Sequence, residues 1–285
     1  MIIFIENGRL GNQLFQLNYI FKIKKKNELV ILIGFDLLKK ILKKHKKIKF
    51  FSSKNFFCKL IIEYRYYITL YLKLFRIIKI VYENSKDNVK IQKGFLSNIS
   101  LVSGFFQNPH FIKSKFISLI NRKTLYEKLA NKKLDILRKK NTKVYFIHYR
   151  SKDFKSWPHK NYPAILPQKW FYKCLKLFPY KFNSLILLSD NPSEFKINLN
   201  KKIVKKKNSI LIDFFIMINS DGGIISPSTF SWWASYINKL DNKDNLILAP
   251  KYWAGHIRKK TIPKNIETLK FKYINVLKRE YKNLV

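Results

Sequence analysis

The stretch of sequence that decides the fold is Val144-Tyr145-Phe146-Ile147-His148-Tyr149-Arg150-Ser151-Lys152-Asp153. Its first six residues form an apolar and aromatic run with a single histidine, which predicts a strand buried within a sheet. Charged side chains follow as soon as the run ends. Ligands bind beyond the carboxyl ends of the strands in open α/β sheets, so this segment predicts both a fold class and a place to look for a site.

The rest of the second half repeats this pattern. Short apolar runs are found at residues 185–188, 202–205, 223–225 and 246–249. Segments with helical periodicity lie between several of them, at about 168–178, 209–219 and 229–239. Alternating strands and helices predict a parallel sheet that is covered on both faces.

The first half begins in the same way, with strand candidates at residues 2–5 and 30–33 on either side of a helical pattern that includes Leu14, Leu17 and Phe21. We further expect one or two amphipathic helices over 60–82, an irregular stretch over 84–98, a strand over 101–106 and a basic-ended helix over 126–140. The two halves together predict an α/β protein of two Rossmann-like domains, residues 1–141 and 142–285, that face each other across a cleft.

Composition limits the function classes. The 285 residues include 58 Lys and Arg against 17 Asp and Glu, a formal net charge of +41. Such a charge attracts nucleic acids, anionic lipids and phosphorylated substrates alike. The lysines are scattered, and the accompanying abundance of Asn, Ile, Phe and Tyr indicates A/T-rich codons as the larger cause. No nucleic-acid-binding module is recognisable, so a nucleic-acid partner is not expected, although it stays the alternative from another class.

The two cysteines, Cys58 and Cys174, are far apart and form neither a disulfide framework nor a zinc motif. A reducing cytoplasm is therefore the expected compartment. The chain starts directly on a structured pattern, so no signal peptide is expected, and no apolar run is long enough to span a bilayer.

Four polar clusters follow predicted strands. Arg150 can bind a pyrophosphate bidentately and Asp153 can orient it, although the pair could also be a surface salt bridge. Ser228 and Thr229 begin a helix, whose N-terminus is suited to anions or is simply capped. The other two clusters are a glycine-containing turn after the first strand and a carboxylate after the strand 185–188: Gly8, Gly11, Asn12 and Gln13 in the turn, and Asp190. Each could bind a ligand; alternatively, the first is an ordinary turn and the second caps the next segment.

No D-x-D motif is present, since Asp241 and Asp244 are spaced differently. Metal-dependent transferases commonly hold their cation through such a motif. Arg150 and the predicted helix N-terminus at Ser228 could instead supply the positive charge that a diphosphate leaving group requires. The clusters therefore predict a pyrophosphate site without a metal ion.

Three clusters together resemble the α-1,2-fucosyltransferase family (glycosyltransferase family 11-like). Residues 8–16, Gly-Arg-Leu-Gly-Asn-Gln-Leu-Phe-Gln, are similar to its N-terminal signature. His148-x-Arg150-x-x-Asp153 resembles its H-x-R-R-x-D motif, and residues 226–233 resemble its S-x-S-x-F-S-W-W segment. Smaller similarities occur, in the family's order, at residues 104–107, 189–190 and 249–253. This chain departs from the pattern at three positions: Ser151, Asn191 and Pro227.

The resemblance implies a GT-B fold and inverting transfer of L-fucose from GDP-fucose to a sugar hydroxyl, with no metal or other cofactor. The N-terminal domain would bind the acceptor and the C-terminal domain the donor. By position, Arg150 would hold the β-phosphate, His148 would lie beside the nucleoside, and Ser228 and Thr229 would bind phosphate oxygens. The remaining donor-side carboxylates would be those of Asp190 and Asp213, the latter at guanine.

The expected product is an α-1,2 linkage to galactose or a similar residue of a bacterial lipopolysaccharide or O-antigen. A transferase of the same fold with another donor or linkage is the close alternative. Asp153 and Glu6 are both candidates for the general base. Because such acceptors are often lipid-linked, we expect a cytoplasmic enzyme at the inner face of the membrane. The segment Leu70–Val81 predicts an amphipathic helix that binds anionic lipid or, alternatively, packs on its own domain.

Overall fold

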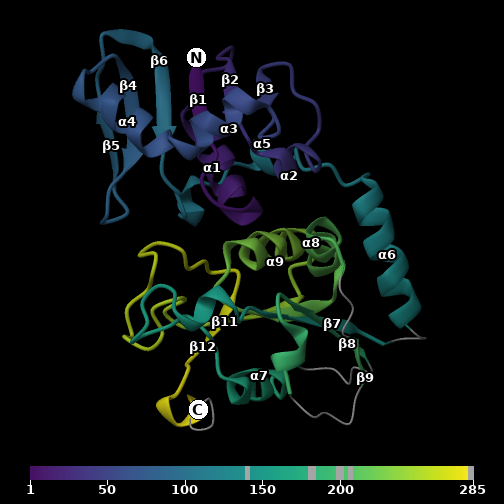
Figure 1. Cartoon of the computed structure of the whole chain (residues 1–285). Coiled ribbons are helices and arrows are strands. Elements are labelled where there is room, and N and C mark those ends of the chain that lie inside the picture. The colour runs from purple at the N-terminus through teal and green to yellow at the C-terminus, as the bar shows by residue number, and fades with distance from the viewer. Residues whose placement is uncertain (139–141, 179–183, 197–201, 205–207, 282–285) are drawn as a thin grey trace. The chain divides into compact units, whose positions relative to one another are not determined.

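The computed structural model describes residues 1–138, 142–178, 184–196, 202–204 and 208–281 (Figure 1). The chain forms two compact units, Met1–Arg122 and Lys123–Val285. Each unit contains its own six-stranded sheet. The predicted α/β class, with two Rossmann-like units in succession, is therefore confirmed.

The sheet of the first unit has the strand order β3-β2-β1-β6-β4-β5, and only β5 pairs antiparallel among its described strands. Its strands are β1 (Ile2–Ile5), β2 (Val30–Ile33), β3 (Ile48–Phe51), β4 (Ile78–Glu83), β5 (Val89–Gln92) and β6 (Leu96–Ser103). The helices are α1 (Leu10–Ile23), α2 (Asp36–Lys39), α3 (Phe56–Glu63), α4 (Arg65–Leu74), α5 (Ser114–Ile117) and a 3-10 turn at Pro109–Phe111.

Two helical layers cover this sheet. On one face, Ile80 and Leu101 pack against Ile61 of α3 and Leu72 of α4. On the other face, the ring of Phe4 contacts Phe106, which in turn stacks on Tyr19 of α1 at 4.0 Å between ring centroids. Apolar residues that alternate along β1 thus enter opposite layers, as strand geometry requires.

The second sheet is entirely parallel in its described pairings, with the order β12-β11-β10-β7-β8-β9. The strands are β7 (Val144–Tyr149), β8 (Ser184–Ser189), β9 (Lys202–Val204), β10 (Gly222–Ile225), β11 (Leu246–Pro250) and β12 (Lys272–Ile274). The helices are α6 (Leu125–Leu137), α7 (Gln168–Leu175), α8 (Ile210–Asn219) and α9 (Thr229–Asp241), with 3-10 turns at Asp153–Lys155, Pro192–Glu194 and Lys278–Tyr281.

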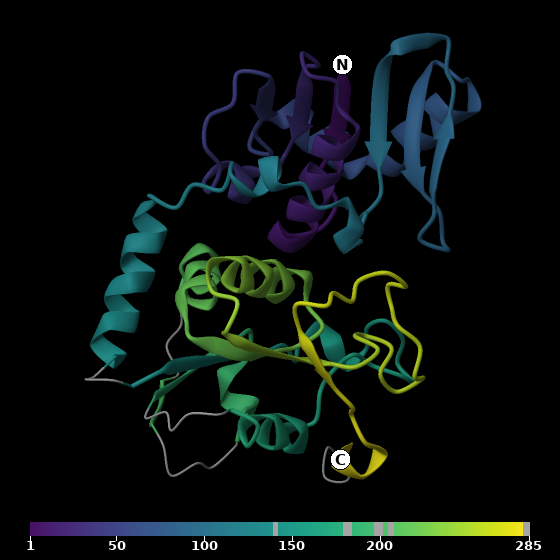
Figure 2. The same cartoon turned by 180° about the vertical axis from the view of Figure 1, so that it is seen from behind.

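Counted from β7, this is the doubly wound order 3-2-1-4-5-6, whose direction reverses between β7 and β10. All six residues of β7 are buried, as its apolar run predicts. Helix α7 packs on one face, where Trp170 and Phe171 meet Tyr145, Ile147 and Tyr149. Helices α8 and α9 cover the other face (Figures 1 and 2).

The units divide between Arg122 and Lys123, whereas the sequence predicts a boundary near residue 141. Helix α6 accounts for the difference, because it packs on α8 of the second unit. Asn219 at the end of α8 donates hydrogen bonds to Glu127 and Asn131 of α6 at 3.2 and 2.6 Å. Residues 139–141, which include the end of the predicted helix 126–140, lie outside the described residues, as does Lys205 of the predicted strand 202–205.

The structure corrects the prediction for residues 60–98. The predicted amphipathic helix Leu70–Val81 is wrong, because α4 ends at Leu74 and residues 78–83 form β4. Arg76 adopts a left-handed backbone conformation, with φ of 47°, at the point where the chain changes direction. The stretch 84–98, predicted to be irregular, contains β5 and the start of β6. Strands β3 and β12 were not predicted.

The C-terminal segment stays with the second unit. In the turn Lys278–Tyr281, Oε1 of Glu280 forms an ion pair with Nζ of Lys173 on α7, at 2.6 Å.

Candidate active site

The candidate site lies at the reversal point of the second sheet. Strands β7, β8 and β10 are parallel neighbours, with Tyr149 opposite Ser189 and His148 opposite Ile225. Their carboxyl ends therefore meet at one edge. The residues that follow these strands, Arg150, Asp190 and Ser226, are consequently brought together although they are far apart in the sequence. Such a reversal point is where open α/β sheets bind ligands.

Arg150 is held by two carboxylates. Its Nε and Nη2 donate to the two oxygens of Asp153 at 2.9 and 2.8 Å, in a bidentate pair. Asp190 Oδ2 lies 3.4 Å from the same Nε. The Arg150 side chain is 17% exposed, whereas that of Asp153 is 51% exposed. Asp153 is thus the solvent-facing partner of this pair.

This arrangement changes the expected electrostatics. One guanidinium faces two carboxylates, so the charged cluster carries no surplus of positive charge before a ligand binds. Among the described residues, the hydrogen bonds of Arg150 side-chain atoms run from Nε and Nη2, which leaves the Nη1 edge available. A bound anion would therefore use Nη1 or compete with Asp153 for the fork.

Ser226 fixes the backbone of this edge. Its hydroxyl donates to the carbonyl of His148 at 2.9 Å and accepts from the backbone N–H of Arg150 at 3.0 Å. On the neighbouring strand, Asp190 Oδ1 accepts from the N–H of Ser151 at 3.0 Å. The sequence prediction named neither Ser226 nor Ser151 as a site residue. Both are fully buried, and the hydroxyl-rich run 226–231 was the signal that could have identified Ser226.

His148 is a neutral group in this fold. Burial, and secondarily the charge of Arg150, lowers the pKa of its imidazole to about 3. The ring lies 5.9 Å from that of Phe230 on α9, and Nδ1 has no hydrogen-bond partner in the described part of the chain. A neutral imidazole can donate a hydrogen bond to a ligand or accept one from it, but it cannot act as a general acid near neutral pH.

The N-terminus of α9 adjoins this cluster through Ser226. Ser228 is the N-cap residue and Thr229 the first residue of the helix, as the sequence predicts. The Ser228 side chain makes no capping hydrogen bond, and the Ser231 hydroxyl donates to the carbonyls of Ser226 and Ser228. First-turn amides of a helix have no partner within it, so this end is suited to an anion.

Asp213 makes no described contact with Arg150, Asp153 or Asp190. It accepts a 2.8 Å hydrogen bond from Asn208 near the start of α8. Burial raises the pKa of its carboxyl to about 6. The adjacent Phe214 contacts Phe230 at 5.7 Å between ring centroids, and Phe230 in turn contacts His148. Rings therefore connect the two regions, but no described contact joins Asp213 to Arg150.

The predicted cleft loop lies at the corresponding edge of the first sheet. Gly8 has a φ of +87°, and a Cβ there would stand 2.3 Å from Asn12 Nδ2. Gly11 is buried in the first turn of α1. Gln13 Nε2 donates to Glu6 Oε2 at 3.1 Å, and the same carboxylate oxygen accepts from the N–H of Phe35 at 2.6 Å. Glycine and amide residues therefore shape this turn.

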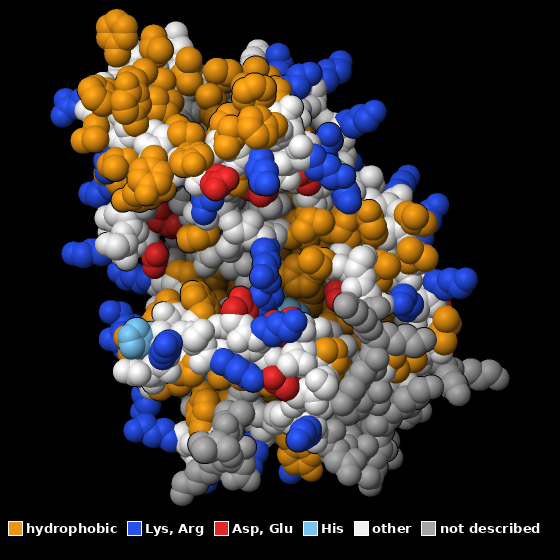
Figure 3. Space-filling view, in the orientation of Figure 1, with side chains coloured by type: hydrophobic (Ala, Val, Ile, Leu, Met, Phe, Trp, Pro, Cys, Tyr) orange, Lys and Arg blue, Asp and Glu red, His pale blue; other side chains and the backbone are white. Residues whose placement is uncertain are grey.

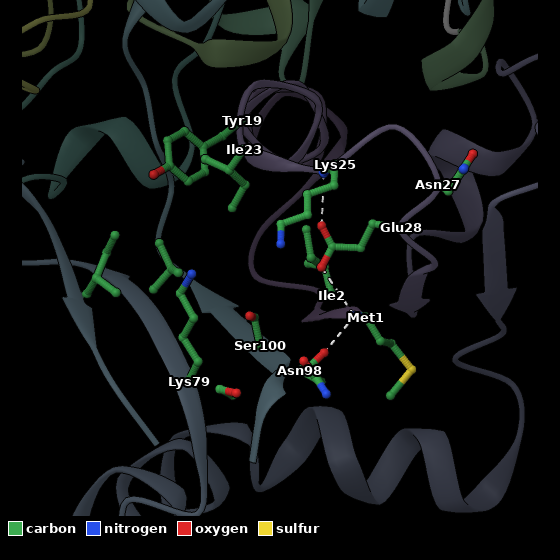
Figure 4. A pocket seen from close by; sticks show the side chains of 13 residues that line it. Met1, Ile2, Tyr19, Ile23, Lys25, Asn27, Glu28, Lys79, Asn98 and Ser100 are labelled. Carbon is green, nitrogen blue, oxygen red and sulfur yellow. Dashed lines mark hydrogen bonds and ion pairs between the residues drawn. The ribbon is translucent and has the colours of Figure 1, made fainter. Parts of the chain in front are cut away.

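A separate cavity of about 480 Å³ opens in the first unit (Figure 4). It lies at the opposite, amino-terminal edge of the sheet, next to Met1, Asn98 and Glu28. None of the predicted site residues lines it. The nitrogen of Met1 donates to Asn98 O and Glu28 Oε1, so these two lining groups already have a partner.

No group of three or more His, Cys, Asp or Glu side chains is placed to hold a metal ion within residues 1–281 as described. No helix of the described chain is long and apolar enough to cross a membrane.

Comparison with known proteins gives three results. No family model matches the chain. The chain is 25% identical over 189 residues to the O-antigen biosynthesis glycosyltransferase WbnK of Escherichia coli, a match that covers 61% of each protein and thus less than two thirds of the relative. One similar solved structure is the NodZ α-1,6-fucosyltransferase, with a TM-score of 0.49 and 10% identity; the match covers 83% of this chain and 92% of that one. Another is POFUT1 in complex with GDP-fucose, with a TM-score of 0.47 and 13% identity; the match covers 84% of this chain and 93% of that one.

Proposed function

We propose that this protein is an inverting glycosyltransferase that transfers L-fucose from GDP-fucose to a sugar hydroxyl. The observation that carries the proposal is the cluster at the reversal point of the second sheet, where Arg150 lies between Asp153 and Asp190. The similarity to an O-antigen glycosyltransferase supports the reaction class. The resemblance of three motifs to α-1,2-fucosyltransferases supports the donor and the linkage.

In this proposal the second unit binds the donor. The β-phosphate of GDP-fucose takes the place of Asp153 at the Arg150 fork, while Asp190 keeps Nε in position. The amides at the start of α9, with Ser228 and Thr229, bind phosphate oxygens. These groups stabilise the charge that develops on the diphosphate as it leaves, without a metal ion.

The chemistry then follows from the displaced carboxylate. The acceptor hydroxyl attacks the anomeric carbon of fucose, the bond to the β-phosphate oxygen breaks, and GDP departs with the bonding electrons. Asp153, half exposed and released from Arg150, accepts the hydroxyl proton. Glu6 is the less suitable base, because its carboxylate already accepts hydrogen bonds from Phe35 and Gln13.

The resemblance to α-1,2-fucosyltransferases supplies the remaining donor contacts. It implies that His148 lies beside the nucleoside and that Asp213 binds the guanine. His148 suits this place, because it is neutral and its Nδ1 has no partner among the described residues. The raised pKa of Asp213 fits a carboxylate that gains a favourable partner when a base donates to it.

The first unit would bind the acceptor. The acceptor is a galactose-like residue of a bacterial surface polysaccharide, carried on a lipid, and the product is α-1,2-linked. The enzyme would work at the inner face of the cytoplasmic membrane.

A donor screen in the presence of excess EDTA tests the proposal. GDP-fucose with a galactoside acceptor should release GDP, with inversion at fucose. Release of UDP from a UDP-sugar would identify a transferase with another donor. Activity that requires Mg²⁺ or Mn²⁺ would contradict the metal-free mechanism. Stabilisation against heating by duplex DNA and not by GDP would indicate a nucleic-acid-binding protein instead.

A further inference from the structure

Helix α4 carries its aromatic side chains on its outward face. Tyr66, Tyr67, Leu70, Tyr71 and Leu74 fall on one side of the helix at helical spacing, and each is at least 41% exposed. None of the residues of α4 is buried. An amphipathic helix of a globular protein normally turns such a stripe toward the core, so this orientation calls for an external partner.

Neighbouring elements extend this stripe. In α3, Phe56 and Phe57 are 68% and 72% exposed. After α4, Phe75 is 64% exposed, and the backbone N–H of Phe95 donates to the carbonyl of Arg76, which places the 92% exposed Phe95 ring beside it. We call the following set the aromatic surface: Phe56, Phe57, Leu60, Tyr64, Tyr66, Tyr67, Leu70, Tyr71, Leu74, Phe75 and Phe95. Figure 3 shows hydrophobic side chains gathered over this part of the first unit.

The concentration of these residues is specific to this region. Of the 24 large hydrophobic side chains that are exposed in the described chain, fourteen lie between residues 51 and 96. The described part of the second unit is longer and has only nine of them, spread from Leu125 to Leu269. Scattered exposed hydrophobic residues are normal on any protein, whereas a contiguous set marks a binding surface.

Basic residues surround the aromatic surface. Between residues 51 and 96 the sequence has nine Lys and Arg against three Asp and Glu. Lys54, Lys59, Arg76 and Lys93 are exposed on the same elements or beside them. Of the acidic residues, Glu83 is turned inward, where its carboxylate accepts from two backbone N–H groups. The partner must therefore be both apolar and negatively charged.

We propose that the aromatic surface binds the interface of an anionic phospholipid bilayer. Tyrosine side chains favour the level of the headgroups, where the ring is buried and the hydroxyl stays wet, and phenylalanine and leucine side chains enter the boundary of the acyl chains. The basic rim gains from anionic headgroups. A second copy of the chain fits less well, because pairing two such surfaces would bring the basic rims together. This inference does not depend on the sugar that is transferred.

Vesicle co-sedimentation of the full chain tests the proposal. The protein should bind vesicles of phosphatidylcholine with phosphatidylglycerol, weakly bind phosphatidylcholine alone, and dissociate as salt is raised. Tyr67→Ser combined with Tyr71→Ser should weaken binding about tenfold, which corresponds to roughly 1.4 kcal/mol. Tyr172→Ser, an exposed tyrosine of α7, is the matched control and should bind like the parent. Release of GDP with a soluble acceptor should be unchanged in every variant.

A second measurement is needed, because a variant that misfolds would also bind vesicles less tightly. Compared with the parent, which has five tryptophans outside the aromatic surface, Phe75→Trp should add blue-shifted emission with anionic vesicles, and brominated acyl chains should quench this added emission. Parent-like vesicle binding by the double tyrosine variant, or absence of quenching at position 75, would overturn the proposal. Concentration-dependent dimerisation that the double variant abolishes, without vesicle binding by the parent, would identify a second copy as the occupant instead.

Discussion

The reversal points of the two sheets are built from different chemistry. In the first sheet, the point between β1 and β6 is spanned by Gln16, which is fully buried and donates to the carbonyls of Asn7 and Gly104 at 2.8 and 3.1 Å. In the second sheet, the point between β7 and β10 holds Ser226 and the charged cluster of Arg150. The same position in the fold thus has buried amides beside the single carboxylate of Glu6 in one unit, and a guanidinium between two carboxylates in the other.

This difference suggests a division of labour. Buried amide groups such as Gln13, whose Oε1 has no hydrogen-bond partner among the described residues, suit the neutral hydroxyls of a sugar. A guanidinium between carboxylates suits a diphosphate that can displace one of them. We therefore expect substitutions at the second edge to alter donor chemistry, and those at the first edge to alter stability and acceptor use.

The largest expected effect is at Arg150. Arg150→Lys keeps the charge but loses the planar fork, so turnover should fall by roughly 100-fold or more while the melting temperature changes little. Arg138→Lys is the matched control, because Arg138 pairs with Asp221 outside the cluster and should retain full turnover. Measurement of GDP release with both variants checks this. Near-parental turnover of Arg150→Lys would remove this residue from the reaction.

Substitution of Gln16 tests the other side of the comparison. Gln16→Ala leaves two backbone carbonyls without their donor and should cost about 1–3 kcal/mol of unfolding free energy. Denaturant unfolding measures this cost, and calorimetry should give an unchanged Kd for GDP. A loss of GDP affinity with full stability would mean that the first edge also contacts the donor.

The pH dependence of stability separates two titratable groups of the second unit. Asp213 has a pKa of about 6 in the fold, above its ordinary 3.8, so its stabilising contribution is complete below pH 3.8 and is lost as pH rises through 6. His148 has the opposite sign: its lowered pKa contributes stability above pH 6.5 that is lost as pH falls toward 3.

Asp213→Asn should therefore stabilise the protein at pH 7.5, by at most about 3 kcal/mol, and have little effect at pH 4. Denaturant unfolding at the two pH values measures the difference. The same variant should bind GDP less tightly if Asp213 contacts guanine, and an unchanged affinity would leave it a structural residue.

The smallest expected effect is the change in GDP affinity when Asp153 is substituted. Asp153→Asn removes the carboxylate that competes with phosphate for Arg150, so GDP should bind a few-fold more tightly, which is under about 1.4 kcal/mol. Turnover should nevertheless fall, because the proposed base is lost. Tighter binding with unchanged turnover would restrict Asp153 to orienting Arg150, and weaker binding would contradict competition.

The sequence predicted the second unit better than the first for a physical reason. Strands such as Val144–Tyr149 are buried on both faces and give continuous apolar runs. Residues 70–83 are ambiguous, because Leu70, Leu74, Ile77 and Val81 fit a helical period although the later part is strand β4. The helix ends where Arg76 takes a positive φ, and no Gly or Pro marks that position. Polar edge strands such as β5 carry too little pattern to be recognised.

The sequence indicates the residues of the candidate site one by one, but not the contacts between them. The pairing of Arg150 with Asp153 is local in sequence and could be anticipated. The approach of Asp190 and the bridging role of Ser226 depend on β7 lying between β8 and β10, which is a property of strand order. That two carboxylates share one guanidinium could therefore not be predicted, and it changes how a phosphate must enter.

The most direct test of the central claim is calorimetric titration with GDP and GMP in excess EDTA, for the parent and for Arg150→Lys. If Arg150 holds the β-phosphate, the parent should bind GDP at least about tenfold more tightly than GMP, which is roughly 1.4 kcal/mol, and the variant should lose this preference. An equal preference for GDP over GMP in parent and variant would contradict the assignment of the diphosphate to the reversal point of the second sheet.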